Sequence, residues 1–132
     1  MHLRHLERYP LRTPYNEQAD RIAHLVRRPE LVSVKTLPWE PTLYRWPPTL
    51  IVDATGVGRA VTDLLKERDL RFKAVTITAG DATKYNPKGA NVPKRDLVAA
   101  LQVPFHSGNL KVAEGLHLWP TLKEELTNFR RR

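Results

Sequence analysis

Cysteine is absent from the 132 residues, and this absence excludes several kinds of site. A disulfide framework, a thiolate zinc site and a cysteine nucleophile all need a residue that the chain does not have. Long apolar runs are also missing, and the longest uncharged stretches are far too short to span a bilayer. The opening residues, MHLRHLERYP, carry charges where a secretory signal has its apolar segment. The sequence therefore predicts a cytoplasmic protein with no membrane partner.

Acidic residues are in the minority. The chain has 22 Lys and Arg against 14 Asp and Glu, which gives a net charge of +8. This balance is typical of proteins that meet polyanions such as nucleic acid. The cations are spread along the chain and do not form one tail, so an ordinary solubilising surface is the alternative.

Apolar periodicity and helix breakers predict strands that alternate with helices. For example, Ala19, Ile22, Ala23 and Val26 recur at helical spacing behind a Thr13 cap. The predicted strands cover 2–9, 49–52, 71–78 and 110–113. The predicted helices cover 14–28, 57–68, 93–104 and about 120–129. This order predicts a single α/β domain over 1–132, with helices packed on a sheet that contains parallel pairs and a right-handed β-α-β unit over 49–78.

Two segments are predicted to be connections. Residues 36–48, TLPWEPTLYRWPP, hold four of the eleven prolines, which argues against a helix or a central strand. Trp39 and Trp46 in this segment either bind a base or a partner, or cap the edge of the core. Residues 80–91 are polar, which indicates a flexible loop.

The stretch LIVDATGVGRAVTDLL places Asp53 where a predicted buried strand gives way to a helix, through a turn at Gly56 and Gly58. The turn lacks the third glycine of a dinucleotide fingerprint and the lysine of a phosphate-binding loop. Two interpretations stay open. Asp53 is either a carboxylate ligand for Mg²⁺ or Mn²⁺, or a cap of the following helix that accepts N–H bonds from the turn.

Further metal ligands are hard to find elsewhere. Glu7 on the first predicted strand and Asp81 after the third are the additional candidates, with a surface ion pair to Arg4 or Arg8 for Glu7 and a turn role for Asp81 as alternatives. No two histidines share a helix face at zinc-binding spacing, and no serine lies in a nucleophile elbow.

Five pieces of the sequence, in order, resemble the nuclease domain of phage terminase large subunits, the DNA-packaging motors. The pieces are VDATGVG, AVTITAGD, VPKRDLVAAL, SGNLKVA and TLKEELTNF, and the opening LRHLERYPLRTPY is similar as well. The resemblance covers nearly the whole chain and is weakest in the Pro/Trp-rich segment 36–48. It implies a ribonuclease H-like fold, a phage or prophage origin in a bacterial host, and a Mg²⁺- or Mn²⁺-dependent endonuclease that works with two metal ions.

Only one of the three acidic residues of that family has a counterpart in this sequence. Asp53 corresponds to the second of three, whereas the first would precede residue 1 and the third would follow Phe129. The resemblance therefore implies a fragment truncated at both ends, without the central first strand and the final elements, and catalytically incomplete on its own. A non-catalytic accessory module that binds DNA or packaging proteins is the alternative.

Partners follow from the same resemblance. Lys84, Lys88, Lys94 and Arg95 are the candidate phosphate contacts, because the loop they flank is expected near the Asp53 end of the sheet. DNA is the expected partner, and phage packaging proteins are a further one. A missing central strand would leave sheet edges open, so self-association into a homo-oligomer is also expected.

Overall fold

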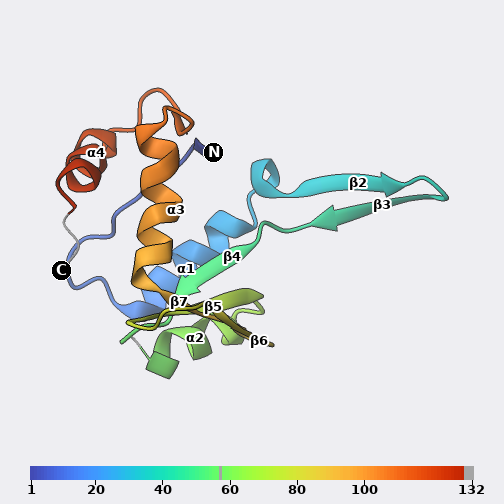
Figure 1. Ribbon diagram of the computed structural model, residues 1–132. Coiled ribbons are helices and arrows are strands. Elements are labelled where there is room, and N and C mark those ends of the chain that lie inside the picture. The colour runs from blue at the N-terminus through green and yellow to red at the C-terminus, as the bar shows by residue number, and fades with distance from the viewer. Residues whose placement is uncertain (57, 130–132) are drawn as a thin grey trace.

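A four-stranded sheet organises the chain in the computed structural model, which describes residues 1–56 and 58–129 (Figure 1). Helices and strands both contribute, so the fold is mixed α/β, as the sequence predicts. In chain order the elements are β1 (His2–Leu3), α1 (Tyr15–Val26), the 3₁₀ turn η1 (Pro29–Leu31), β2 (Ser33–Leu37), β3 (Glu40–Trp46), β4 (Leu50–Asp53), α2 (Gly58–Glu67), β5 (Phe72–Thr78), β6 (Lys84–Asn86), β7 (Gly89–Pro93), α3 (Lys94–His106), β8 (Lys111–Val112) and α4 (Trp119–Asn128).

The strand order of this sheet is β4-β5-β7-β6. β5 pairs in parallel with β4 and with β7, while β6 pairs antiparallel with β7. The carboxyl ends of the three parallel strands therefore lie together at one end of the sheet, which we call the carboxyl end. The amino ends of these strands lie at the opposite end, which we call the amino end.

The strand before Asp53 is exposed, contrary to the sequence prediction of a buried strand. β4 is the outermost strand, and its residues alternate between half-buried and exposed. Leu50 and Val52 face inward, whereas the side chain of Ile51 is 62% exposed. A short run of β-branched residues predicts a strand but not its place in the sheet, because that place depends on which neighbours pair with it. The interior strands are β5 and β7.

The helices α1 and α2 pack against each other through small and apolar side chains. Ala19 and Ala23 of α1 are buried, and Leu65 of α2 is fully buried. An ion pair closes the crossing, because Arg68 Nε lies 2.6 Å from Asp20 Oδ1. The predicted Thr13 cap was wrong: its hydroxyl donates to the carbonyl of Pro10 at 2.7 Å, and no side chain caps α1.

The Pro/Trp-rich segment, predicted to be a connection and neither a helix nor a central strand, forms most of a β-hairpin. β2 and β3 pair antiparallel from Ser33 opposite Trp46 and project as an arm away from the sheet (Figure 1). The register slips near the tip, which leaves Pro41 outside the paired residues. Proline is tolerated at such a bulge because it removes no ladder hydrogen bond there. We call Ser33–Trp46 the arm.

The segment 80–91 also contains strands, where the sequence predicted only a flexible loop. β6 and β7 form a hairpin whose turn is Pro87-Lys88, and the side chain of Asn86 accepts a hydrogen bond from the N–H of Lys88 at 2.9 Å. Asn-Pro-Lys-Gly is a recognisable turn sequence, but the strands on either side are short and carry little apolar signal.

Both chain ends differ from their predictions in detail. The expected strand 2–9 pairs only over His2–Leu3, parallel to β8, because β8 is itself two residues long. α3 was predicted to end at Pro104 but continues to His106, because the proline falls in the last turn of the helix. The carbonyl of Pro104 accepts the N–H of Leu110 at 2.9 Å. α2 and α4 lie where the sequence predicts them, apart from Val57 and 130–132, which lie outside the described residues.

Gly89 is the tightest point of the sheet and gives a stability prediction. A Cβ at this position would lie 1.8 Å from the carbonyl oxygen of Ala74 and 2.7 Å from its carbonyl carbon. We expect Gly89→Ala to lower the free energy of unfolding by about 2 kcal/mol or more, because backbone atoms of β5 and β7 must separate. Urea denaturation measures this change.

The matched control is Gly80→Ala, where the nearest atom to a new Cβ is the Thr78 hydroxyl at 3.5 Å. That variant is expected to stay within about 1 kcal/mol of the unchanged chain. Equal stabilities for the two variants would contradict the close approach of β5 and β7.

Candidate functional site

Asp53 ends β4 at the carboxyl end of the sheet, where open α/β sheets bind ligands. Its side chain is exposed, and its Oδ1 accepts the backbone N–H of Thr55 at 2.8 Å. The hydroxyl of Thr55 in turn accepts the N–H of Ile77 at 2.7 Å. The turn after β4 is therefore held against β5 by side-chain contacts, and Gly56 continues it with a φ of 73°. Asp53 closes a local turn.

Hydrogen bonding from the side chain and the backbone of Thr55 lowers the pKa of Asp53 below its ordinary value. The stabilised form is the carboxylate, because both donors interact more strongly with a negative oxygen. Asp53 is thus ionised at neutral pH and open to solvent. One exposed carboxylate binds Mg²⁺ weakly, since this ion releases its waters reluctantly.

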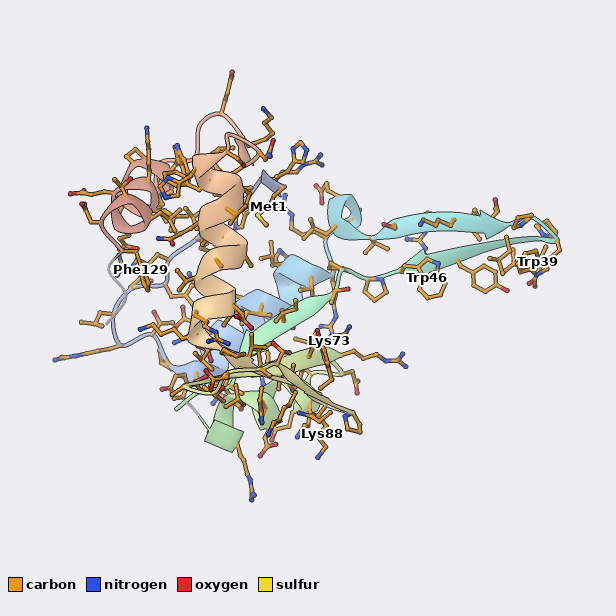
Figure 2. All side chains as sticks on the ribbon, viewed as in Figure 1. Met1, Trp39, Trp46, Lys73, Lys88 and Phe129 are labelled. Carbon is orange, nitrogen blue, oxygen red and sulfur yellow. The ribbon has the colours of Figure 1, made fainter. Side chains whose placement is uncertain are left out.

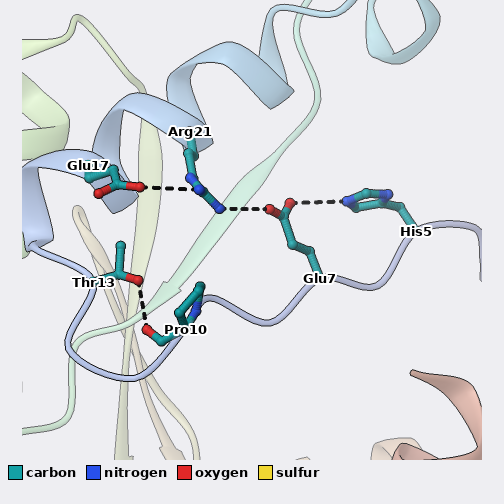
Figure 3. Close-up of polar contacts among 6 residues, drawn as sticks. All are labelled: His5, Glu7, Pro10, Thr13, Glu17 and Arg21. Atoms are coloured by element: carbon teal, nitrogen blue, oxygen red, sulfur yellow. Dashed lines mark hydrogen bonds and ion pairs between the residues drawn. The ribbon is translucent and has the colours of Figure 1, made fainter. Parts of the chain in front are cut away.

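Glu7 is engaged with α1 and its neighbour in the chain (Figure 3). Its carboxylate lies 3.6 Å from Arg21 Nη1 and 3.4 Å from His5 Nε2. Arg21 also pairs with Glu17 at 3.2 Å and lies over the ring of Tyr9, 5.5 Å from its centroid. The expected surface ion pair is therefore present, but with Arg21 as the partner instead of Arg4 or Arg8.

Asp81 follows β5 and pairs with Arg95 at the start of α3. Arg95 Nη1 lies 3.2 Å from Asp81 Oδ1, and its other terminal nitrogen donates to the Asp81 carbonyl. Both residues line a cavity of about 480 Å³ at the carboxyl end of β5, together with Lys94 and Phe129. Lys94 Nζ lies 5.6 Å from the centroid of the Phe129 ring. Asp53 is on the neighbouring strand, outside this lining.

The acids therefore do not fit a two-metal centre as they are placed. Asp53 bonds to Thr55, Glu7 to Arg21, and Asp81 to Arg95. Two-metal hydrolysis needs several carboxylates that converge on ions roughly 4 Å apart. Among residues 1–56 and 58–129, no group of three or more His, Asp or Glu side chains is arranged to hold a metal ion.

Cations gather at the amino end of the sheet. A groove of about 540 Å³ there is lined by Arg27, Arg71 and Lys73, with Asp69 as the acid in the same lining. The backbone of Lys88 lies next to that of Lys73, because β7 pairs with β5 and the N–H of Ala74 donates to the Lys88 carbonyl at 3.0 Å. Figure 2 shows both lysines at this end of the sheet. We call Arg27, Arg71, Lys73 and Lys88 the basic cluster.

The four basic residues singled out in the sequence do not share one surface. Lys94 and Arg95 lie at the carboxyl end, as expected, but both contact other side chains there. Lys88 lies at the amino end and Lys84 on β6, the opposite outer strand from β4. The hairpin β6–β7 causes this separation, because it carries Lys88 back to the start of β5.

Sequence reasoning missed Arg27, Arg71 and Lys73 as candidate contacts. The signal that finds them is the turn Asn-Pro-Lys-Gly, since a hairpin there brings Lys88 next to the residue before Ala74. Arg27 is harder to place, because only the packing of α1 on α2 brings it to this groove. Its guanidinium donates to the carbonyl of Arg68 at 2.6 Å.

The Asp53 turn gives a prediction about titration. We expect Thr55→Val to raise the pKa of Asp53 towards its ordinary value, because the side-chain hydrogen bond is lost. The lowered pKa contributes stability that is present above the unfolded-state pKa and is lost as the pH falls through the folded-state pKa. Titration of the Asp53 carboxyl carbon by NMR measures the shift. Thr55→Ser, which keeps the hydroxyl, is the control and should titrate like the unchanged chain. Equal Asp53 pKa values in the Val and Ser variants would contradict the assignment.

Comparison with known proteins gave no match to a protein family, to a curated protein or to a solved structure. Within the described residues, no helix is both long and apolar enough to cross a membrane.

Proposed function

We propose that this chain is a DNA-associated module related to the nuclease domain of phage terminase large subunits, and that on its own it binds DNA without cleaving it. The finer fold in this proposal is ribonuclease H-like. Support comes from the parallel β4–β5 unit joined by α2, with an acid at the end of its first strand. The similar pieces VPKRDLVAAL and TLKEELTNF fall on α3 and α4, one after the other.

The basic cluster is the observation that carries DNA binding. Three of its members line one groove with a single acid, Asp69, and Lys88 adjoins them. Phosphates in a duplex recur at short intervals, so several cations at one sheet end can each neutralise one of them. The cations at the carboxyl end are less available, because Arg95 pairs with Asp81 and Asp96. We therefore assign the main contact to the amino end.

The absence of cleavage follows from the placement of the acids. Each candidate carboxylate has its own partner in a different part of the chain, so this chain's residues hold no shared cation position in the described structure. In this proposal, Asp53 caps the turn that leads from β4 into α2.

A metal-dependent nuclease is the second candidate. It is favoured by the exposure of Asp53, its lowered pKa and its position at the carboxyl end of parallel strands. Such a nuclease would need Mg²⁺ or Mn²⁺ and further acids, and it too would be related to the terminase nuclease domains.

DNA binding is tested with the double variant Lys73→Gln, Lys88→Gln. Affinity for a 20-base-pair duplex, followed by fluorescence anisotropy over a salt series, should fall. The slope of log K against log salt should shrink by about 2, because two phosphate contacts are lost. Lys123→Gln on α4 is the matched control and should leave the slope unchanged. A Lys94→Gln, Arg95→Gln variant tests the carboxyl end. If that variant alone lowers the slope, the amino-end assignment is wrong.

Cleavage is tested on supercoiled plasmid with Mn²⁺ at neutral pH. We expect no nicking by the unchanged chain, and DNA binding by Asp53→Asn equal to that of the unchanged chain, since Asp53 lies away from the basic cluster. Nicking that requires Mn²⁺ and disappears in Asp53→Asn would establish the second candidate instead. Nicking activity that fails to co-elute with the chain would instead come from a contaminating nuclease.

A further inference from the structure

The arm exposes an unusual amount of apolar surface. Its large side chains stand mostly in solvent: Trp39 is 78% exposed, Leu43 67%, Trp46 56% and Val34 51%. Figure 2 shows Trp39 at the tip and Trp46 nearer the body, both away from the sheet. Monomeric proteins rarely leave such patches uncovered, and an isolated two-stranded hairpin is marginally stable in water. The arm therefore needs a surface to pack on.

The apolar side chains of the arm are divided between its two faces, so they do not cover one another. The pairing of Val34 with Arg45 and of Thr36 with Leu43 puts one apolar set on one face. Trp46, opposite Ser33, lies on the other face with Tyr44. Charge points only weakly to nucleic acid, because the arm has two cations, Lys35 and Arg45, against one acid, Glu40. The arm is apolar more than it is basic, which favours a protein surface.

A complementary hollow lies on the sheet of the same chain. The face that carries Ile51, Val75 and Val92 forms a groove of about 380 Å³ that is mostly apolar, and Tyr85 and Lys73 also line it. Ile51 is 62% exposed and Tyr85 86% exposed, so the groove is open. α3 reaches only the carboxyl end of this face, where Val98 and Ile77 line the other cavity. An apolar projection and an apolar groove thus coexist on one chain.

The total surface also exceeds that of a compact monomer. The chain exposes 10641 Å², whereas the size relation for folded monomers gives about 7,100 Å² for a protein of 15.2 kDa. The difference is large enough to include a whole protein–protein interface, which in specific complexes covers about 1,200–2,000 Å² in total.

We propose that the arm is a dimerisation element, and that the arm of one copy packs on the sheet groove of a second copy. The exchange is reciprocal, because each chain brings one arm and one groove and a two-fold axis satisfies both. With a tryptophan side chain taken as about 200 Å², the face that carries Val34 and Leu43, together with Trp39 at the tip, offers on the order of 350 Å². Two arms and the two surfaces they cover then bury roughly 1,400 Å², which lies within the range of specific complexes.

Sedimentation velocity over a concentration series tests the proposal on the full chain. The unchanged chain should sediment as a dimer at micromolar concentration, and the dimer should persist or strengthen in 1 M salt, because apolar burial holds it and the chains carry the same charge. Leu43→Lys on the arm and Ile51→Lys in the groove should each weaken dimerisation at least tenfold. Leu11→Lys, at an exposed apolar residue outside both surfaces, is the matched control and should leave it unchanged. Circular dichroism melting curves establish that each variant is folded.

A cross-link locates the contact. Because the chain has no cysteine, Trp39→Cys gives one attachment point for a maleimide photo-cross-linker. Mixed ¹⁴N and ¹⁵N chains should give inter-chain cross-links to peptides that contain 51–53 or 84–93. A monomer at all concentrations, intra-chain cross-links only, or a dimer that Ile51→Lys leaves intact would each overturn the proposal. Loss of DNA affinity in Leu43→Lys without any change in oligomeric state would also overturn it, and would assign the arm to nucleic acid.

Discussion

β5 is hydrogen-bonded along both of its edges, to β4 and to β7, and the position of each candidate site depends on this double pairing. On the β4 side it places Asp53 opposite Val75, close enough for Thr55 to reach the N–H of Ile77. On the β7 side it requires a residue without a side chain at Gly89, where β7 begins. The same pairing brings Lys88 beside Lys73. A single interior strand therefore organises the acid turn at one end of the sheet and the basic cluster at the other.

Charge is distributed by local pairing. The acids near the carboxyl end and near α1 are largely matched by neighbouring arginines, as in the pairs of Asp81 with Arg95 and of Glu7 with Arg21. These pairs are exposed and contribute little to stability, but they reduce the positive field around them. The surplus of cations is consequently felt most where acids are scarce, in the groove at the amino end. The arm adds an apolar surface, and the groove proposed to receive it shares Lys73 with the basic cluster.

The sequence predicts the parts of the fold that depend on local pattern. The apolar spacing of α1 and α4, the strand β5 and the mixed α/β class all follow from periodicity and helix breakers. What it could not predict depends on pairing between distant residues. Ile51 is apolar and β-branched, yet it is exposed because α3 covers only the carboxyl end of the sheet face on which Ile51 lies. Pro41 argues against a strand, but it lies in the bulge of β3, where no ladder hydrogen bond needs its N–H.

The candidate site shows the same division. The Asp53 cap could be predicted from the strand-turn-helix pattern, and was one of two interpretations left open by the sequence. The partner of Glu7 could not, because Arg21 is fourteen positions away and its contact depends on how the chain returns to α1. The neighbouring positions of Lys73 and Lys88 depend on the β6–β7 hairpin. The strands of this hairpin are too short to be predicted from the sequence pattern.

Two consecutive prolines, Pro47 and Pro48, join the arm to β4. Each proline ring restricts its own backbone torsion and that of the residue before it, so this link is stiff. Little conformational freedom remains to be lost when the arm meets another surface, and the entropic cost of docking is correspondingly small. A stiff link also transmits force. A pull on the tip is delivered to Leu50 and along β4 to the turn at Asp53, so an event at the far end of the arm is mechanically connected to the carboxyl end of the sheet.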